Sequence, residues 1–523
     1  MYWRILKTKL SLALFCGTFV GCVGSSLGVA FGYEANDGVM YSTAPAPGYY
    51  QAINESTVNL APEDVGAYGS TWTNDDEGAV SGGSAQGVLT GGIPELEELQ
   101  KQLSELQAST EKLRGDFEDE KKKNKKETKI TDPFTMKLSG HVSMDSAFVT
   151  EDETARQEIG NVKNSFSLRD LRVTMKGSGY GCLDYVFGFG VNNSISIKDA
   201  YLAIKDTAYF GDVKIGNYFV ESGMESVQAT FDRVFVAVDE TSAVFSLYRR
   251  LGVSSTYYGA DKQTRLFFGT FLGPSLSSPP HNCVDNDPGL VLNTRLTAAP
   301  ICIVDEDGFT REVFHVGGSS YWYLPGKEST LRVRTRGQMW NGSNPYFFDG
   351  VIALNGDSYS TSQAEVAYQY GEFAISGEGF YMNVSDGGGE AYGTTVAARC
   401  FLTPHCSRTY NKNAGRFGTV NMPDEHVFLN FKDRVIGQNW GALEAVGKWE
   451  WLETDNLHNV IPASGGNTTG TVVRTVAGAN WFLNQQTFFA TNWEHAWATP
   501  RKGEQKLDTA EFDTLTIQMT FRF

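Results

Sequence analysis

The sequence lacks a hydrophobic run long enough to cross a membrane as a helix. Its one extended apolar stretch, Leu10–Val23, is glycine-rich and falls short of the roughly 20 residues that such a span needs. Basic residues are also in deficit, since 44 Lys and Arg stand against 61 Asp and Glu and give a formal net charge of -17. No basic patch dominates, so the composition argues against a nucleic-acid partner. Any further membrane signal must therefore come from strands.

Cysteine is scarce as well. Behind the N-terminal run the chain has only Cys182, Cys283, Cys302, Cys400 and Cys406. An odd number leaves at least one thiol free or intermolecular, and the natural local disulfides are Cys283–Cys302 and Cys400–Cys406. His and Cys show no repeated short-spaced ligand pattern, and neither a Gly-x-Ser-x-Gly elbow nor a metal-binding helix occurs. The sequence therefore predicts no metal, no cofactor and no enzyme.

The first 32 residues have the pattern of a cleaved secretory signal. Basic residues precede the apolar run and a small-x-small site follows it: Arg4, Lys7 and Lys9, then Ala30, Phe31 and Gly32. This pattern predicts removal of residues 1–32 and a mature chain that begins near Tyr33. Cys22, which follows a Phe-Val-Gly sequence, leaves open a lipoprotein site that would tether the N-terminus to lipid.

Two unlike segments follow the signal. Residues 33–92 are rich in Gly, Ser, Ala and acidic residues, which predicts a flexible extension. In residues 93–129 apolar side chains recur at steps of three and four, with Thr110 in the remaining seam position: Leu96, Leu99, Leu103, Leu106, Leu113 and Phe117. These roughly three heptads predict a short coiled coil between several chains, followed by a charged linker. One amphipathic helix packed on its own chain is the alternative.

Apolar and polar residues alternate regularly through residues 512–523, so one face of the strand they form is apolar and the other is polar. Leu515, Ile517, Met519, Phe521 and Phe523 share one face, and Thr514, Thr516, Gln518, Thr520 and Arg522 share the other. One face suits lipid and the other suits water. Aromatic residues make up 13% of the chain and Gly is abundant at 56, as expected for strands with aromatic belts and many turns.

Short alternating segments of this kind recur through residues 130–523. The predicted strands lie near 135–148, 166–176, 184–191, 197–205, 212–218, 249–258, 264–271, 313–322, 330–339, 363–370, 373–383, 392–401, 441–453, 472–483, 487–498 and 512–523. An even set of about sixteen predicts an all-β fold, a closed antiparallel transmembrane β-barrel with an open lumen. Closure satisfies every backbone polar group within the sheet, as lipid requires.

Several short motifs resemble the phosphate-selective porin O and P family. They are Met136-Lys-Leu-Ser-Gly140, Leu168-Arg-Asp-Leu-Arg-Val-Thr-Met-Lys-Gly177, Lys198-Asp-Ala-Tyr-Leu202, Val213-Lys-Ile-Gly216, Arg249-Arg-Leu-Gly-Val253, Phe401-Leu-Thr403, Gly415-Arg-Phe-Gly418 with Pro423, and Trp481-Phe-Leu-Asn484. The resemblance covers residues 134–523. It implies a trimeric sixteen-stranded porin of the bacterial outer membrane, with long loops folded into the lumen and a basic constriction.

One predicted strand provides a candidate for that basic wall. In residues 330–339, Arg332, Arg334 and Arg336 share one face while apolar neighbours share the other. An arginine on the lipid face costs about 2–4 kcal/mol at mid-membrane, so a wall strand would turn all three into the lumen. Arg250 and Arg172 have the same phase relative to their apolar neighbours. Pairing of these arginines with loop carboxylates is the alternative.

The segment 219–248 stands where a constriction loop should fold inward, and it is acidic. It contains Glu221, Glu225, Asp232, Asp239 and Glu240, with Arg233 as its one basic residue. This departs from the basic cluster of the family. An acidic loop against a basic wall sets up a transverse field that sorts polar solutes with little binding.

Two other connections could narrow the pore. Residues 272–312 are predicted as a long extracellular loop. Residues 402–440 follow a strand that runs toward the periplasm, where so long a turn is unusual. By the family resemblance this segment enters the lumen, and otherwise it hangs in the periplasm; its candidate pore residues are Arg408, Lys412, Arg416, Lys432 and Arg434.

The function predicted from these patterns is passive diffusion through an outer-membrane porin. The expected cargo is small hydrophilic solutes or ions, with a preference for small anions through the arginine ladder. The expected partners are outer-membrane lipid and two further copies in a homotrimer with periplasmic N-termini. A structural protein that contacts the cell wall through its N-terminal extension, or an outer-membrane enzyme, are the alternatives.

Overall fold

The computed structural model of the chain describes residues 134–523 except 193, 274–282, 285–288, 327–328, 338–343, 432–433, 438 and 464–465. The predicted signal (1–32), flexible extension (33–92) and coiled coil with its linker (93–129) lie outside the described residues. So do Cys22, Lys432 and the segment on which cell-wall contact was predicted.

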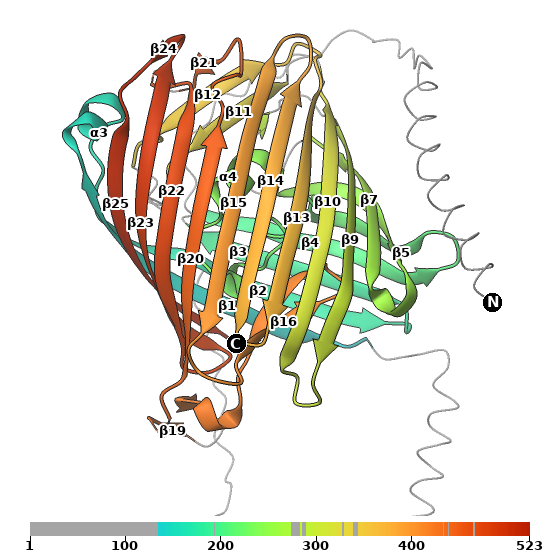
Figure 1. Cartoon of the computed structure of the whole chain (residues 1–523). Helices are drawn as coiled ribbons and strands as arrows, with labels where there is room; N and C mark the ends of the chain where they lie inside the picture. Colours follow the sequence, from blue (N-terminus) through green and yellow to red (C-terminus); the bar gives the residue numbers. More distant parts are fainter. Residues whose placement is uncertain are drawn as a thin grey trace, which may run out of the picture. The chain divides into compact units, whose positions relative to one another are not determined.

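Sixteen strands of the described part form one closed antiparallel wall (Figure 1). They are β1 (Lys137–Glu151), β2 (Ser165–Gly179), β3 (Leu183–Asn192), β4 (Ser194–Thr207), β5 (Gly211–Phe219), β6 (Arg249–Tyr258), β7 (Thr264–Leu272), β9 (Leu290–Val304), β10 (Thr310–Leu324), β13 (Tyr359–Tyr370), β14 (Phe373–Val384), β15 (Gly389–Phe401), β20 (Ala442–Glu453), β22 (Thr469–Phe482), β23 (Thr487–Lys502) and β25 (Ala510–Arg522). Each strand pairs with the next, and β25 pairs with β1 to close the ring. The predicted fold class is confirmed.

Shorter elements lie in the connections between wall strands. They are α3 (Glu153–Glu158), α4 (Glu240–Phe245), the 3-10 turns Thr230–Asp232, Ala260–Lys262 and Asp424–His426, and strands β8 (Cys283–Val284), β11 (Thr330–Thr335), β12 (Phe348–Ala353), β16 (Ser407–Asn411), β17 (Arg416–Asn421), β18 (Leu429–Asn430), β19 (Val435–Ile436), β21 (Ile461–Pro462) and β24 (Gln505–Lys506). Within the described residues, no helix has the length and apolar character needed to span a bilayer.

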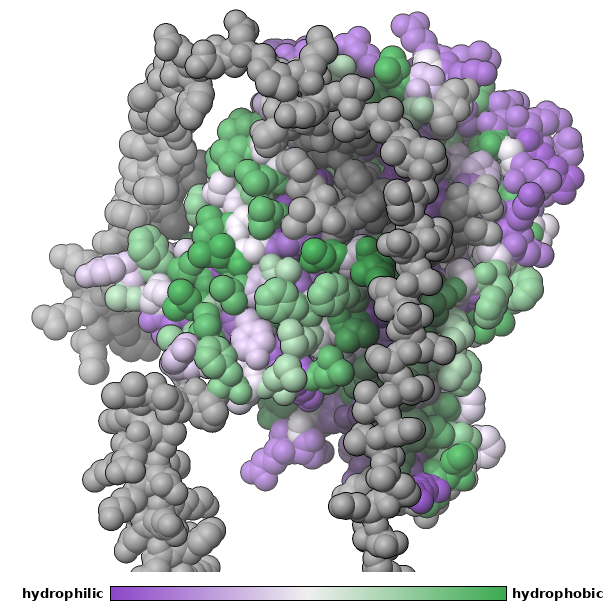
Figure 2. Space-filling model, turned by 180° about the vertical axis from the view of Figure 1, so that it is seen from behind, coloured by the Kyte–Doolittle hydropathy of each residue, from purple (hydrophilic) through white to green (hydrophobic). Residues whose placement is uncertain are grey.

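The last strand, β25, has the two faces that its alternation predicted. Its apolar side chains, from Leu515 to Phe523, are 36–51% exposed, whereas Thr514, Thr516, Gln518 and Thr520 are 1–6% exposed and point inward. Figure 2 shows hydrophobic residues gathered over the middle of the visible wall and hydrophilic residues toward its two ends. The outer face therefore suits a lipid bilayer and the inner face is polar.

A charge placed on this outer face should destabilise the barrel. We expect Ile517→Arg to lower the free energy of unfolding by about 2–4 kcal/mol, because Ile517 is 42% exposed on the outward side of β25 and lipid cannot solvate a guanidinium. Urea unfolding in lipid vesicles, followed by tryptophan fluorescence, measures the change. The matched variant Lys506→Arg lies in the exposed β24 and should leave the midpoint unchanged.

The two ends of the barrel differ in the length of their connections. At the end that carries the C-terminus (lower in Figure 1), β13 and β14 are joined by only two residues, and Gly371 takes a positive φ of 56° that a glycine adopts without a Cβ clash. The opposite end carries longer connections, including residues 220–248, 273–289 and 325–358. The connection 402–441 is the long exception at the C-terminal end.

Two strand predictions were wrong, and they offset each other in the count. Residues 272–312 are not one loop, because β9 crosses the wall between β7 and β10 with thirteen residues in register with β10. Residues 330–339 are not a wall strand, because β11 pairs with β12 and β8 in a separate four-stranded sheet. The other fifteen predicted strands lie in the wall.

The predicted disulfides do not form, since Cys302, Cys400 and Cys406 are all free. Cys302 lies in β9, near the end that turns into β10 at the C-terminal end of the barrel, whereas the strand containing Cys283 pairs with β11 at the opposite end. Cys400 pairs with Phe373 and Ala445 in the wall, while Cys406 is fully buried inside. Spacing along the chain did not predict proximity for the first pair, because β9 carries the chain from one end of the barrel to the other between Cys283 and Cys302.

Candidate permeation pathway

The connection between β5 and β6 folds into the barrel and reaches the opposite wall. This inner loop, residues 220–248, contains α4 and is largely buried. At its start, the carboxylate of Glu221 accepts two hydrogen bonds of 2.6 Å from the Arg265 guanidinium of β7. Farther along, the Val236 backbone N–H donates to Asn492 Oδ1 of β23 at 2.8 Å. The loop thus spans the lumen between two distant parts of the wall.

The acidic residues of the inner loop are paired with basic residues. Each carboxylate has a cation within ion-pair distance: Glu221 with Arg265 (2.6 Å) and Arg295 (3.3 Å), Glu225 with Arg233 (3.3 Å), Asp232 with Arg416 (3.3 Å), Asp239 with Lys448 (2.7 Å) and Glu240 with Arg474 (3.2 Å). Burial raises the pKa of Glu240 to about 7 in spite of Arg474. The acidic constriction face predicted from the sequence is therefore largely neutralised in place.

Arg474 is the main residue that holds the inner loop against the wall strands β20, β22 and β23. Its guanidinium is fully buried in β22 and lies 3.2 Å from Glu240, 3.1 Å from Glu494 and, through Nε, 2.6 Å from Glu450. Lys448 bridges Asp239 of the loop and Glu450 of β20 at 2.7 and 2.9 Å. Three strands are thereby joined to α4 by one buried ionic network.

Removal of the Arg474 charge should destabilise the folded barrel. We expect Arg474→Met to lower the free energy of unfolding by about 3–5 kcal/mol, because the buried carboxylates would lose their shared cation. The change is read from urea unfolding in vesicles. Arg311→Met is the matched control, since Arg311 pairs with Asp305 at an exposed site and should change stability by less than about 1 kcal/mol.

A second segment enters the lumen from the C-terminal end. This inner hairpin, residues 407–421, consists of β16 and β17 and forms the first half of the long 402–441 connection. Arg408 is 1% exposed and makes bidentate bonds of 2.9 and 2.7 Å to Glu444 of β20. At the hairpin tip, Arg295 of β9 donates to the carbonyl oxygens of Ala414 and Gly415 at 3.0 and 2.8 Å.

The inner hairpin and the inner loop meet inside the barrel. Arg408 Nη1 donates to the Asp232 carbonyl oxygen at 2.7 Å, and Arg416 lies 3.3 Å from the Asp232 carboxylate. Residues 407–421 therefore occupy the lumen, as one of the two alternatives for 402–440 predicted, whereas β18 and β19 lie beyond the barrel rim (Figure 1). Arg408 and Arg416 are inside. Lys412 lies in the hairpin turn, and Arg434 lies in the outer part, between β18 and β19.

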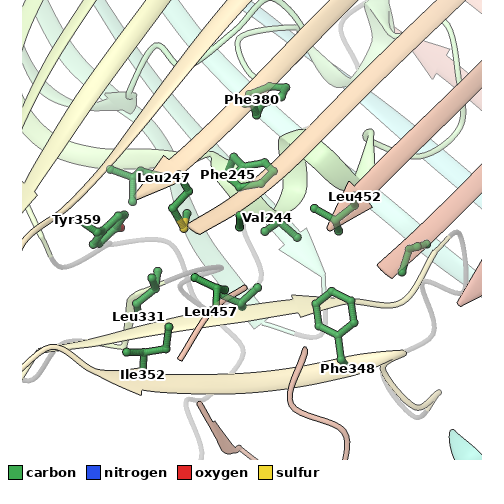
Figure 3. Packing of buried hydrophobic residues seen from close by; sticks show 14 of the residues in the cluster. Val244, Phe245, Leu247, Leu331, Phe348, Ile352, Tyr359, Phe380, Leu452 and Leu457 are labelled. Atoms are coloured by element: carbon green, nitrogen blue, oxygen red, sulfur yellow. The ribbon is translucent and has the colours of Figure 1, made fainter. Parts of the chain in front are cut away.

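The predicted arginine ladder lies on the small sheet at the other end. Figure 3 shows Leu331 and Ile352 of this sheet facing Val244, Phe245 and Leu247 of the inner loop. Leu331 and Val333 are 0% and 1% exposed, so the apolar face of β11 is covered by protein. The alternation in 330–335 is real, but the lipid argument for turning these arginines into the lumen does not apply to β11.

The three ladder arginines have local partners. Arg332 makes bidentate bonds of 2.7 and 2.6 Å to Asp349 of β12. Arg334 and Arg336 both lie over the ring of Tyr346, at 5.2 and 5.0 Å. Burial lowers the pKa of Arg334, which stays a cation at neutral pH. Pairing with a carboxylate, the alternative to a ladder in the lumen, thus holds for Arg332, whose partner Asp349 lies on the neighbouring strand β12.

Arg172 and Arg250 both lie on inward positions of the wall. Arg172 of β2 is bonded to Asp170 at 2.8 Å and is 14% exposed in its side chain. Arg250 of β6 is 1% exposed and donates to the carbonyl oxygens of Leu247 and Gly273. Arg172 therefore borders the lumen, whereas Arg250 fastens the two loop ends beside it.

Three inward cations that sequence reasoning did not select are only half-buried. They are Lys198 of β4, Lys214 of β5 and Arg522 of β25, and among the described residues none has a carboxylate within ion-pair distance. Lys198 extends over Gly190, where a Cβ would lie 2.3 Å from Lys198 Cε. Lys214 lies 4.7 Å from the centre of the Tyr201 ring, and Arg522 lies 4.5 Å from that of Phe231 in the inner loop. We call these residues the lumen cations.

A signal for the lumen cations was present in the sequence. Lys214 and Arg522 both have apolar neighbours in the outward phase, Ile215 and Phe521, which are 55% and 36% exposed. The strand β4 was harder to interpret, because its register with β3 shifts between Phe187 and Phe189 and changes the phase near Lys198.

A closed sixteen-strand barrel with an apolar outer band, a polar charged lumen and inward-folded loops defines an outer-membrane channel of the porin type. A family model described as phosphate-selective porin O and P matches residues 142–523. The match covers more than half of the chain, so the chain belongs to the phosphate-selective porin O and P family. This family and fold indicate a channel rather than an enzyme.

Comparison with solved structures gives matches of low sequence identity. OmpT of Vibrio cholerae in its trimer form is 10% identical, with 75% of this chain and 100% of that chain covered and a TM-score of 0.44. An anion-selective porin from Comamonas acidovorans is 11% identical, with 75% of this chain and 100% of that chain covered and a TM-score of 0.43. The outer membrane channel DcaP of Acinetobacter baumannii is 12% identical, with 75% of this chain and 97% of that chain covered and a TM-score of 0.42. No curated protein matches the chain.

Proposed function

We propose that this porin conducts small hydrophilic solutes by passive diffusion and prefers anions. The observation that carries the proposal is a charge imbalance in the lumen. The inner-loop carboxylates are paired with basic residues, whereas Lys198, Lys214 and Arg522 are half-buried with no carboxylate at ion-pair distance among the described residues. The electrostatic potential that the charges without an ion-pair partner create along the inward wall is therefore positive.

In this proposal the constriction lies between the inner loop and the wall formed by β2 to β5. On the far side, lumen groups such as Arg295, Glu365 and Arg474 are 0–4% exposed, which leaves little room for a solute. On the near side, Arg172, Lys198 and Lys214 are less buried. A narrow passage with one charged wall weakens ionic screening relative to bulk water, so a few cations can bias selectivity.

Single-channel recording in a planar bilayer tests this function. We expect discrete conductance steps and, in a salt gradient, a reversal potential of the sign that indicates anion preference. Purified folded protein that gives no steps would contradict the channel, and a cation-selective reversal potential would contradict the anion preference alone.

We further propose a homotrimer with periplasmic N-termini. The first wall strand begins at Lys137 and the last ends at Arg522, at the same end of the barrel, and short turns at that end are the periplasmic pattern. The heptads in 93–118 would then hold three chains together on the periplasmic side.

Deleting residues 93–118 should loosen this trimer. Crosslinked species of three chains should become fewer in the deletion variant than in the full chain, while single-channel steps persist. Equal crosslinking with and without the segment would show that the coiled coil has no part in assembly.

A further inference from the structure

Beyond the inner hairpin the chain leaves the lumen and forms a small extension at the barrel rim. This rim extension, residues 427–440 except 432, 433 and 438, contains β18 and β19 and lies below the wall in Figure 1. The backbone N–H groups of Phe428 and Leu429 donate to the Leu483 carbonyl oxygen, at 2.9 and 3.0 Å, in the turn between β22 and β23. The rim extension is thus attached to one part of the wall.

Large apolar side chains of this extension are exposed. Phe431, Ile436 and Trp440 are 56%, 73% and 89% exposed. Water solvates three such exposed apolar side chains at one rim poorly.

The exposed side chains continue the outward face of the barrel. The Phe431 ring packs edge-on against Phe521 of β25, with centroids 6.0 Å apart, and Phe428 packs likewise against Trp481 of β22 at 5.5 Å. Trp481 Nε1 also donates to the Trp440 carbonyl oxygen at 2.7 Å. Phe521 belongs to the apolar face of β25 that suits lipid, so the extension adjoins the membrane-facing wall and not the lumen.

We propose that the rim extension is a membrane anchor whose Phe431, Ile436 and Trp440 insert into the interfacial layer of the periplasmic leaflet. The partner is the lipid surface itself. An indole with an apolar ring and one N–H donor is favoured at this depth, between headgroups and acyl chains.

Fluorescence quenching by lipid tests the anchor. The full chain and Trp440→Phe are reconstituted in phosphatidylcholine vesicles with or without bromine on shallow acyl carbons, and the difference between the two proteins gives the Trp440 emission. We expect bromine to quench that emission at least about twofold, because an interfacial indole lies within its reach. Trp493→Phe provides the matched positive control, since Trp493 is 48% exposed on the outward face of β23.

Two results would overturn the proposal. Water-like Trp440 emission without quenching would place the extension in the aqueous phase. Blue-shifted emission without quenching would show that protein, such as a second copy of this chain, covers the residue. Conductance steps identical to those of the parent would show that Trp440→Phe has folded, so failure of the anchor is distinguishable from failure of the channel.

Discussion

Replacing residues 407–421 with a short Gly-Ser linker should raise the single-channel conductance severalfold. These residues form the inner hairpin, which occupies the lumen between β9, β20 and the inner loop. Conductance of a water-filled pore rises with its open cross-section, and a sixteen-stranded barrel without inward segments encloses an aqueous channel. The measurement is the step size in planar bilayers at fixed salt concentration.

The barrel should survive this replacement. Glu444, which loses Arg408, retains Arg399 at 3.7 Å, and Arg295 retains Glu365 at 2.7 Å and Glu221 at 3.3 Å. Deleting residues 429–436 is the matched control, because it shortens the same connection outside the lumen and should leave the step size unchanged. An unchanged conductance after loss of 407–421 would mean that the hairpin lies beside the ion path.

Neutralising the three lumen cations should lower the anion-to-cation permeability ratio severalfold. A unit charge about 4 Å from a passing ion contributes roughly 1 kcal/mol even in bulk water, and the pore screens less. The triple variant Lys198→Gln, Lys214→Gln and Arg522→Gln removes these charges at half-buried positions without breaking an ion pair among the described residues. Reversal potentials in a salt gradient give the ratio.

The matched control removes three lysines outside the lumen. Lys262 lies in a 3-10 turn, and Lys502 and Lys506 end β23 and β24; all three are exposed, and their replacement by Gln changes the net charge by the same amount. We expect no shift in reversal potential from this control. Equal shifts in both variants would show that total charge, rather than the lumen wall, sets selectivity.

Replacing the predicted ladder tests the alternative location of the selectivity wall. Asp349 neutralises Arg332 through two short hydrogen bonds, so this arginine should contribute less to the pore potential than an unpaired lysine does. If Arg332→Ala lowers anion preference as strongly as Lys198→Gln, the small sheet lies on the ion path after all.

Strand alternation was sufficient to predict the closed barrel and most of its wall. In β25 the pattern fixed which side chains face outward, because side chains on a strand alternate and each face meets only one environment. The same pattern failed at β11, where the apolar side chains pack on α4 instead of lipid. Alternation reports that one face is apolar, and it does not report whether lipid or protein covers that face.

The sequence by itself determined the class of fold, the outward residues of the wall and the acidic character of the inner loop, because these depend on local periodicity and composition. Only the tertiary structure decided which charges remain unpaired. Glu240 meets Arg474 across 234 positions of the chain, and Arg416 meets Asp232 across 184, through two segments that enter the lumen from opposite ends. Ion pairing at such separation depends on how loops fold inside the closed wall. In the described part of the chain this arrangement leaves Lys198, Lys214 and Arg522 half-buried on inward wall positions with no carboxylate at ion-pair distance.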